Sequence, residues 1–205
     1  MSTAVQLPSS VPTIPTRMTV DEFLALPGDG AGTIYELVNG EVRAQDAASD
    51  THGTMQSNLI ALIRRHLRAN RPGCRVVTAP GVRPRLLAKW NHRIPELGVT
   101  CVPNRAGVRA IPDPILLIEI LSPSNYEETW SNIPLYASLP SVAEILIVDS
   151  TKVAAELLRR GSDGSWPQEP DPIAPNDTIH LASIGLDIPL AEVYTDTYLA
   201  ETGGV

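Results

Sequence analysis

The most constraining feature of the sequence is a continuous apolar run with one carboxylate inside it, over residues 114–121 (PILLIEIL). A run of this kind predicts a buried strand. Successive side chains of a strand point to opposite faces, so Glu119 shares a face with Leu117 and Leu121. Because an unpaired carboxylate is unfavourable in an apolar interior, we expect Glu119 to be protonated, ion-paired or bound to a metal ion.

Two other predicted strands each carry one acid. Residues 93–102 (RIPELGVTCV) place Glu96 in an otherwise apolar strand. Residues 33–42 (TIYELVNGEV) contain an Asn-Gly pair between alternating runs, which is typical of a two-residue hairpin, and Glu36 lies on the strand before it. Three carboxylates that converge on one point repel one another, and a hard divalent cation such as Mg²⁺ is the usual reason to hold them together.

The remaining pattern mixes helices and strands. A capping-box sequence at residues 19–22 opens a short helix to about Leu26, and Ser49 or Asp50 caps a helix over 51–69. Further strands are predicted over 74–78, 82–87, 143–148, 152–160 and 178–181, with a loop over 161–177 and a final helix over 190–198. A helix is also predicted within 125–139, and Pro134 disturbs it unless that proline lies in its first turn. This order predicts an α/β fold with a mixed central sheet flanked by helices.

The length of 205 residues is that of one domain. We expect a flexible tail rich in proline, serine and threonine over 1–17, a single domain over 18–198 and a C-terminal tail over 199–205. The sequence has no apolar run of membrane-spanning length and its N-terminus lacks the pattern of a secretory signal, so we expect a cytoplasmic protein with no membrane partner. Cys74 and Cys101 are far apart in sequence, and we expect both to be reduced and buried.

The charges are unevenly distributed. The formal net charge of -7 argues against a general basic coat for nucleic acid. Residues 51–95, however, contain no Asp or Glu and include Arg64, Arg65, Arg68, Arg71, Arg75, Arg83, Arg85, Lys89 and Arg93. This basic segment, residues 64–93, is either a DNA-binding surface or an ordinary solvated set of side chains, depending on whether the fold gathers it. An aromatic content of 4% leaves little material for stacking platforms that bind single strands.

His52 stands at the start of the helix predicted over 51–69. Two positions are open to its side chain. It either faces the predicted carboxylates or caps the helix at the surface, and its place in the sequence slightly favours the surface.

Seven segments carry a family resemblance: MTVDEFLALP, YELVNGEV, HG at 52–53, the PE of RIPELGV, LLIEILSPSN, LPSVAEILIVD and GLDIPLAEVY. In this order and spacing, from about residue 18 to 194, they resemble the bacterial Uma family of restriction-endonuclease-like proteins, a branch of the PD-(D/E)XK nuclease superfamily. The resemblance implies a restriction-endonuclease-like core and a site in which Glu36, Glu96 and Glu119 hold Mg²⁺ or Mn²⁺ for hydrolysis of DNA phosphodiester bonds.

The sequence departs from the family pattern at two places. Glu96 stands where the family has Asp, and it is one methylene longer. The superfamily lysine is replaced by Leu121, and Asn132 occupies the helix position where this family commonly carries a substitute lysine. Asparagine can hydrogen-bond a water molecule but brings no positive charge. His52, Lys89 or an arginine of the basic segment is left to supply that charge.

These observations support two functions of different classes. The first is a Mg²⁺-dependent endonuclease with Glu36, Glu96 and Glu119 as metal ligands and Asn132 or His52 as the group that positions water. The second is a catalytically inactive nuclease fold that serves as a nucleic-acid-binding or assembly module, which the two departures and the acidic charge favour. Hydrolysis of a small phosphorylated substrate is a third alternative. The resemblance also implies a homodimer.

Overall fold

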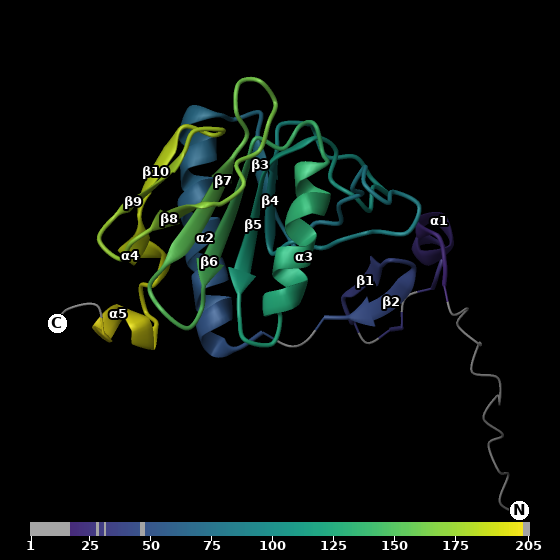
Figure 1. Cartoon of the computed structure of the whole chain (residues 1–205), viewed down its shortest axis with the longest axis horizontal. Coiled ribbons are helices and arrows are strands. Elements are labelled where there is room, and N and C mark those ends of the chain that lie inside the picture. Colours follow the sequence, from purple (N-terminus) through teal and green to yellow (C-terminus); the bar gives the residue numbers. More distant parts are fainter. Residues whose placement is uncertain (1–16, 28, 31, 46–47, 203–205) are drawn as a thin grey trace, which may run out of the picture.

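The computed structural model describes residues 17–27, 29–30, 32–45 and 48–202, so the N-terminal tail predicted over 1–17 lies almost wholly outside the described residues. The centre of the molecule is one mixed sheet with the strand order β3-β4-β5-β6-β7-β8 (Figure 1). Its strands are β3 (Arg75–Thr78), β4 (Leu97–Thr100), β5 (Pro114–Leu121), β6 (Glu144–Asp149), β7 (Ala155–Arg159) and β8 (Asp171–Ile173). β5 and β6 are parallel and the other neighbours are antiparallel, which confirms the predicted α/β fold.

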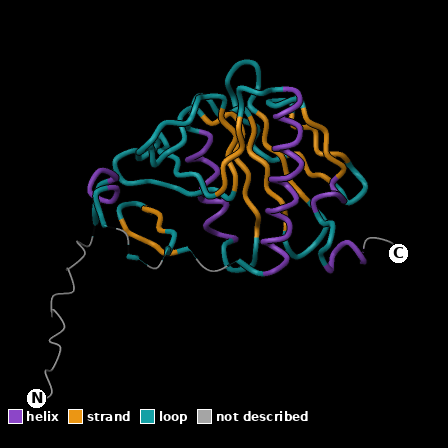
Figure 2. Tube along the Cα trace, turned by 180° about the vertical axis from the view of Figure 1, so that it is seen from behind, coloured by secondary structure: helices purple, strands orange, loops and turns teal. Residues whose placement is uncertain are grey.

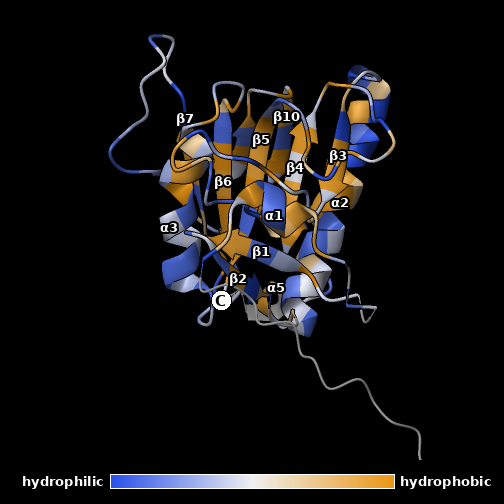
Figure 3. Ribbon diagram, turned by 90° about the vertical axis from the view of Figure 1, so that its right-hand side faces the viewer, coloured by the Kyte–Doolittle hydropathy of each residue, from blue (hydrophilic) through white to orange (hydrophobic). Residues whose placement is uncertain are grey.

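Helices cover both faces of this sheet. Helix α2 (Asp50–Asn70) lies on one face and α3 (Tyr126–Ala137) on the other, and Figure 2 shows α2 from its own side. The alternation along β5 divides the core as predicted: one cluster joins Leu116, Ile118 and Ile120 to Met55, Leu59 and Ile63 of α2, and the other joins Leu117 and Leu121 to Ile133 and Tyr136 of α3. Figure 3 shows hydrophobic residues concentrated in the strands between them. None of the described helices is both long and apolar enough to cross a membrane.

The predicted hairpin forms a separate two-stranded sheet of β1 (Tyr35–Val38) and β2 (Glu41–Ala44). Its turn residues Asn39 and Gly40 have φ angles of 51° and 89°, which is the left-handed conformation that an Asn-Gly turn supplies. Reciprocal backbone hydrogen bonds join Leu37 to His92 at 2.9 and 3.0 Å. Helix α1 (Val20–Leu24), which has the predicted capping box, packs beneath Leu37. The hairpin is thereby held beside the segment that leads into β4.

The C-terminal third departs from the prediction. A second small sheet pairs β9 (Thr178–Leu181) with β10 (Leu186–Pro189), and neither β10 nor β8 was expected. The predicted final helix is wrong in extent: α4 (Leu190–Val193) ends early and α5 (Tyr198–Thr202) follows, because Asp196 between them has a φ of 63° that a helix does not accommodate. All but the first residue of α5 falls in the expected C-terminal tail over 199–205, and Leu199 of this helix is buried in the core.

The strand predicted over 82–87 is also wrong. Val82 makes a single bridge to Arg93, after which Pro84 has no amide hydrogen to donate and Leu87 adopts a φ of 53°. The helix predicted within 125–139 is α3. Pro134, which we expected to disturb it, lies inside α3, and the helix continues past the proline to Ala137. Packing of the residues on either side of this proline against the sheet maintains the helix.

Cys74 and Cys101 form a disulfide, and the expectation that both are reduced and buried is therefore wrong. They are 27 residues apart in sequence, but the antiparallel register that pairs Arg75 with Thr100 places them opposite one another at the end of the β3–β4 ladder. Cys101 is exposed. The spacing of two cysteines along the chain carries no information about this register, so the pairing could not be read from it.

Candidate active site

A cavity of about 560 Å³ opens at the end of the sheet where β5 finishes and α2 and α3 begin. Figure 1 shows these ends of the three elements on the same side of the molecule. Its lining includes all of the predicted site residues: Glu36, His52, Glu96, Glu119 and Asn132. They come from five different places in the fold, namely β1, the first turn of α2, the residue before β4, β5 and the middle of α3. The fold therefore gathers side chains that lie as far apart in the sequence as Glu36 and Asn132.

Glu119 is a buried acid of the cavity, with 5% of its surface exposed. The Tyr136 hydroxyl donates to its Oε1 at 2.6 Å, and the Asn132 amide donates to the same oxygen at 3.5 Å. The pKa of Glu119 is raised to about 8: burial is the largest cause, the hydrogen bond from Tyr136 opposes it, and the neighbouring charges of Glu96 and Glu36 add to it. A cation beside this group would offset that burial and repulsion.

Glu96 is held by two side chains from α2. Gln56 Nε2 donates to its Oε2 at 2.6 Å, and His52 Nε2 lies 2.8 Å from its Oε1. The contact between His52 and Glu96 is short enough for an ion pair but is not aligned as a hydrogen bond. His52 Nε2 therefore has no hydrogen-bond partner among the described residues. His52 is 6% exposed and faces the carboxylates, so the surface position that the sequence favoured is wrong. The cap of α2 is Ser49, whose hydroxyl accepts from the His52 amide.

Glu36 has a cationic partner that sequence reasoning did not place in the site. Arg93 Nη1 donates to Glu36 Oε2 at 3.3 Å and lies 3.5 Å from Glu128 Oε1. Gln45 Nε2 donates to the other oxygen of Glu36, Oε1, at 2.8 Å. Burial raises the pKa of Glu36, and the Gln45 hydrogen bond and the charge of Arg93 act in the opposite direction. Arg93 is 2% exposed and lies 57 residues from Glu36 in the sequence, so no local sequence pattern could have identified this buried pair.

Two polar atoms of the cavity lining are buried and lack a hydrogen-bond partner among the described residues. One is Asn132 Oδ1 and the other is His52 Nε2. Buried polar groups without a partner are rare in folded proteins and mark places where water, an ion or a ligand is expected. Lys89, the other candidate for the missing positive charge, is exposed and lies 4.8 Å from the Trp90 ring, outside the cavity lining.

The three acids are not drawn together as one ligand group. Within the described ranges, no three His, Cys, Asp or Glu side chains lie close enough to hold a metal ion. Each acid instead has its own partners, as given above. The chemistry of the oxygen atoms nevertheless suits a hard cation, since the carboxylates of Glu96 and Glu119 and the unpartnered amide oxygen of Asn132 line the same cavity.

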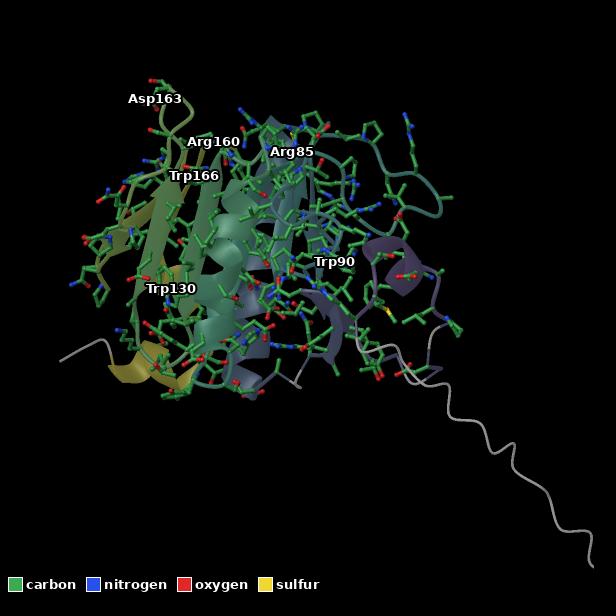
Figure 4. All side chains as sticks on the ribbon, turned by 45° about the vertical axis from the view of Figure 1, so that its right-hand side comes forward. Arg85, Trp90, Trp130, Arg160, Asp163 and Trp166 are labelled. Carbon is green, nitrogen blue, oxygen red and sulfur yellow. A yellow bond between two sulfur atoms is a disulfide. The ribbon has the colours of Figure 1, made fainter. Side chains whose placement is uncertain are left out.

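The rest of the lining is largely neutral. Hydroxyl groups from three segments face the cavity: Ser49, Thr51, Ser122, Ser124, Thr129, Ser150 and Thr151. Arg43 is the one lysine or arginine among the described lining residues. Arg93 is the member of the basic segment that contacts a site acid, Glu36, whereas the rise of α2 places Arg64 to Arg71 roughly 18 to 28 Å along the helix from His52. The backbone amide of Arg85 donates to the Ser138 hydroxyl just past the C-terminal end of α3, and Arg85 is labelled in Figure 4.

Comparisons with known proteins agree with this fold. The family model Uma2, described as "Putative restriction endonuclease", matches residues 20–191. An uncharacterized protein of Synechocystis sp. is 28% identical over 166 residues, which are 78% of this chain and 83% of the relative. A crystal structure from Anabaena variabilis, described as a "putative nuclease belonging to DUF820", superposes with a TM-score of 0.68 at 17% identity and covers 87% of this chain and 98% of its own.

The structural match, at that identity, shows a shared fold, and the family model extends over most of the described chain. The predicted restriction-endonuclease-like core is confirmed, as is the resemblance carried by the seven sequence segments. The five side chains of the cavity all lie within the matched residues. The chain belongs to the Uma2 family of nuclease-like proteins.

Proposed function

We propose that the protein is a divalent-metal-dependent endonuclease that hydrolyses DNA phosphodiester bonds. The observation that carries the proposal is the arrangement around Glu119: a buried acid whose pKa is raised to about 8 faces, in one cavity, a second acid and the unpartnered oxygen of Asn132. Removing these groups from water and placing like charges together is unfavourable unless a cation offsets it. Membership of the Uma2 family supports the same reaction class.

Glu119, Glu96 and Asn132 Oδ1 would hold the cation, with Glu36 completing the acidic side of the cavity. When bound, Mg²⁺ or Mn²⁺ would lower the pKa of an attacking water and offset the negative charge that builds on the phosphate. Oxygen ligands of this kind are the ones that Mg²⁺ prefers.

The protein side chains have distinct roles in this proposal. Tyr136 and Gln56 fix one oxygen each of Glu119 and Glu96. His52 Nε2 and Asn132 Oδ1 are the two buried atoms left to hydrogen-bond a water molecule in the cavity. Arg93 is a buried, fixed positive charge whose guanidinium lies 3.3 Å from Glu36, so it would supply part of the positive charge that the missing lysine would give.

The test is cleavage of supercoiled plasmid by the purified chain in Mg²⁺ or Mn²⁺, with EDTA as the metal-free control. Glu119→Ala removes the central acid, and Glu169→Ala removes an exposed acid outside the cavity. We expect nicking that needs the metal, is lost in Glu119→Ala and is kept in Glu169→Ala. Nicking by Glu119→Ala at the wild-type rate would contradict the proposal.

The separate pairing of each acid favours a second function, a nuclease fold that binds nucleic acid or assembles without hydrolysis. Salt-dependent DNA binding with no cleavage in either metal would support it. The homodimer and the cytoplasmic location implied at the outset stay predictions, and light scattering of the purified chain would test the first.

A further inference from the structure

We propose that the substrate enters this site as an unpaired strand, with bases stacked on Tyr198, which lines the cavity, and on Tyr126, at the start of α3. The inference rests on the proposed nuclease function and specifies its substrate class. It is carried by the shape of the groove, by the position of the exposed aromatic rings and by the scarcity of cations around them.

The candidate cavity continues into a second hollow of about 600 Å³. Both are lined by Arg43, Pro123, Ser124 and Glu128, and the second hollow then extends to Tyr126, Glu127 and Ser131 on α3. The two hollows therefore form one groove that runs from Glu119 across the first turns of α3. We call it the α3 groove.

The two most exposed aromatic side chains of the described residues both line the α3 groove. Tyr198 is 57% exposed and lines the cavity, and Tyr126 is 55% exposed and lines the second hollow. The ring of Tyr126 lies 6.4 Å from that of Trp130, one turn further along α3, which supports it from behind. Trp130 is labelled on α3 in Figure 4. Exposed rings with such support suit base stacking, which is tolerant of sequence.

The low aromatic content of the chain argued against this mode of binding, but the position of the rings matters more than their number. Tyr136 and Tyr194, by contrast, are fully buried and tied into the core by their hydroxyl groups. Among the described residues, the two aromatic side chains with more than half of their surface exposed thus lie at the α3 groove, and Tyr35, at 36%, lies outside it.

The charges of the groove disfavour a duplex. Arg43 is its one lysine or arginine within the described lining, against the acids Glu36, Glu96, Glu119, Glu127 and Glu128. Duplex binding depends on neutralising several phosphates of two strands, and the arginines of α2 are too far from the groove to do so. A single strand brings fewer phosphates to the groove than a duplex does, so it needs fewer cations, and the hydroxyl groups of Ser122, Ser124 and Ser131 are neutral donors for its backbone.

The test measures binding and cleavage of a fluorescent 12-nucleotide DNA in Mn²⁺, as a single strand and as the matching blunt duplex. The variants are Tyr126→Ala/Tyr198→Ala, the ring-preserving Tyr126→Phe/Tyr198→Phe, and the control Leu87→Ala, which alters an exposed apolar residue outside the groove. We expect the wild type to bind the single strand at least about tenfold more tightly than the duplex, and the Ala pair to lose roughly tenfold or more of that affinity. The Phe pair and Leu87→Ala should keep it.

Equal affinity for the two forms, or unchanged single-strand binding by the Ala pair, would overturn the inference. The two proposals fail separately. Single-strand preference that depends on the rings but comes without cleavage would contradict hydrolysis and leave the groove as a strand-binding site. Metal-dependent cleavage of relaxed duplex that is indifferent to the rings would support hydrolysis and contradict the stacking. Supercoiled plasmid, whose strands separate locally, should accordingly be nicked faster than relaxed plasmid.

Discussion

Each of Glu36, Glu96 and Glu119 accepts a hydrogen bond from a side-chain amide and has one further partner of its own kind. That further partner is a phenol for Glu119, an imidazole for Glu96 and a guanidinium for Glu36. The acids themselves could be predicted from the sequence, because a charge inside an apolar run stands out. Their partners could not, because Arg93 is 57 residues from Glu36 and Gln56 is 40 residues from Glu96, and no local pattern connects residues so far apart.

The first prediction concerns the pH dependence of stability in metal-free buffer. The pKa of Glu119 is raised to about 8 in the folded chain, so the folded state favours the protonated acid and loses stability as the pH rises from about 4.5 to about 8. Glu119→Gln keeps the shape and both accepted hydrogen bonds but does not ionise. Urea unfolding should therefore give similar stabilities for the two proteins at pH 4, and at pH 9 a more stable variant by roughly 4 kcal/mol. A difference that is the same at both pH values would contradict the raised pKa.

The second prediction concerns the buried pair of Arg93 and Glu36. Their side chains are 2% and 6% exposed, so removing one charge leaves the other buried and unpaired. Arg93→Met should lower the free energy of unfolding at pH 7 by about 3 kcal/mol, and adding Glu36→Gln should restore most of the loss. Lys89→Met, which alters an exposed cation, is the matched control. Strictly additive losses in the double variant would show that the two side chains do not interact.

At the scale of elements, the sequence was informative where local chemistry decides the structure. The Asn-Gly hairpin, the capping box of α1 and the alternation along β5 were all correctly predicted. The strands β8 and β10 were missed because they are short and lie among turn residues, and their formation depends on neighbours that are distant in sequence. The segment 82–87 has the composition of a strand, but Pro84 prevents regular pairing.

The third prediction concerns the edge of the sheet, where the disulfide joins β3 to β4. Closing a loop over 27 residues restricts the unfolded chain, so Cys74→Ser/Cys101→Ser should reduce the free energy of unfolding by about 3 kcal/mol. Urea unfolding of the oxidised wild type, of the reduced wild type and of the variant measures this. The last two should agree, and stability unaffected by reduction would contradict the pairing.

The fourth prediction concerns the C-terminal end of α3, where Arg160 donates to the backbone carbonyls of Ala137, Leu139 and Val142. The same side chain lies 4.9 Å from the Trp166 ring, and both residues are labelled above α3 in Figure 4. Loss of these donors leaves carbonyl groups without partners, so Arg160→Met should cost about 2 kcal/mol of stability. Thermal unfolding compared with the exposed control Arg105→Met would show it, and equal melting temperatures would argue against the cap.

At the scale of the whole molecule, the sheet serves to bring distant segments to one end. β5 finishes there, and α2 and α3 both begin there, so the positive ends of two helix dipoles point towards the acidic cavity (Figure 1). The fold class could be predicted because the elements follow one another in a recognisable order. The strand order and the disulfide could not, since both depend on how the strands pair in three dimensions.

The cavity is proposed to hold a divalent cation through Glu119, Glu96 and Asn132. Isothermal titration calorimetry measures the Mn²⁺ affinity of the wild type, of Glu119→Ala and of the control Glu169→Ala, each shown to be folded by circular dichroism. We expect one site per chain in the wild type and the control, and at least about tenfold weaker binding in Glu119→Ala. Wild-type affinity in Glu119→Ala, or no binding by the folded wild type, would contradict the claim.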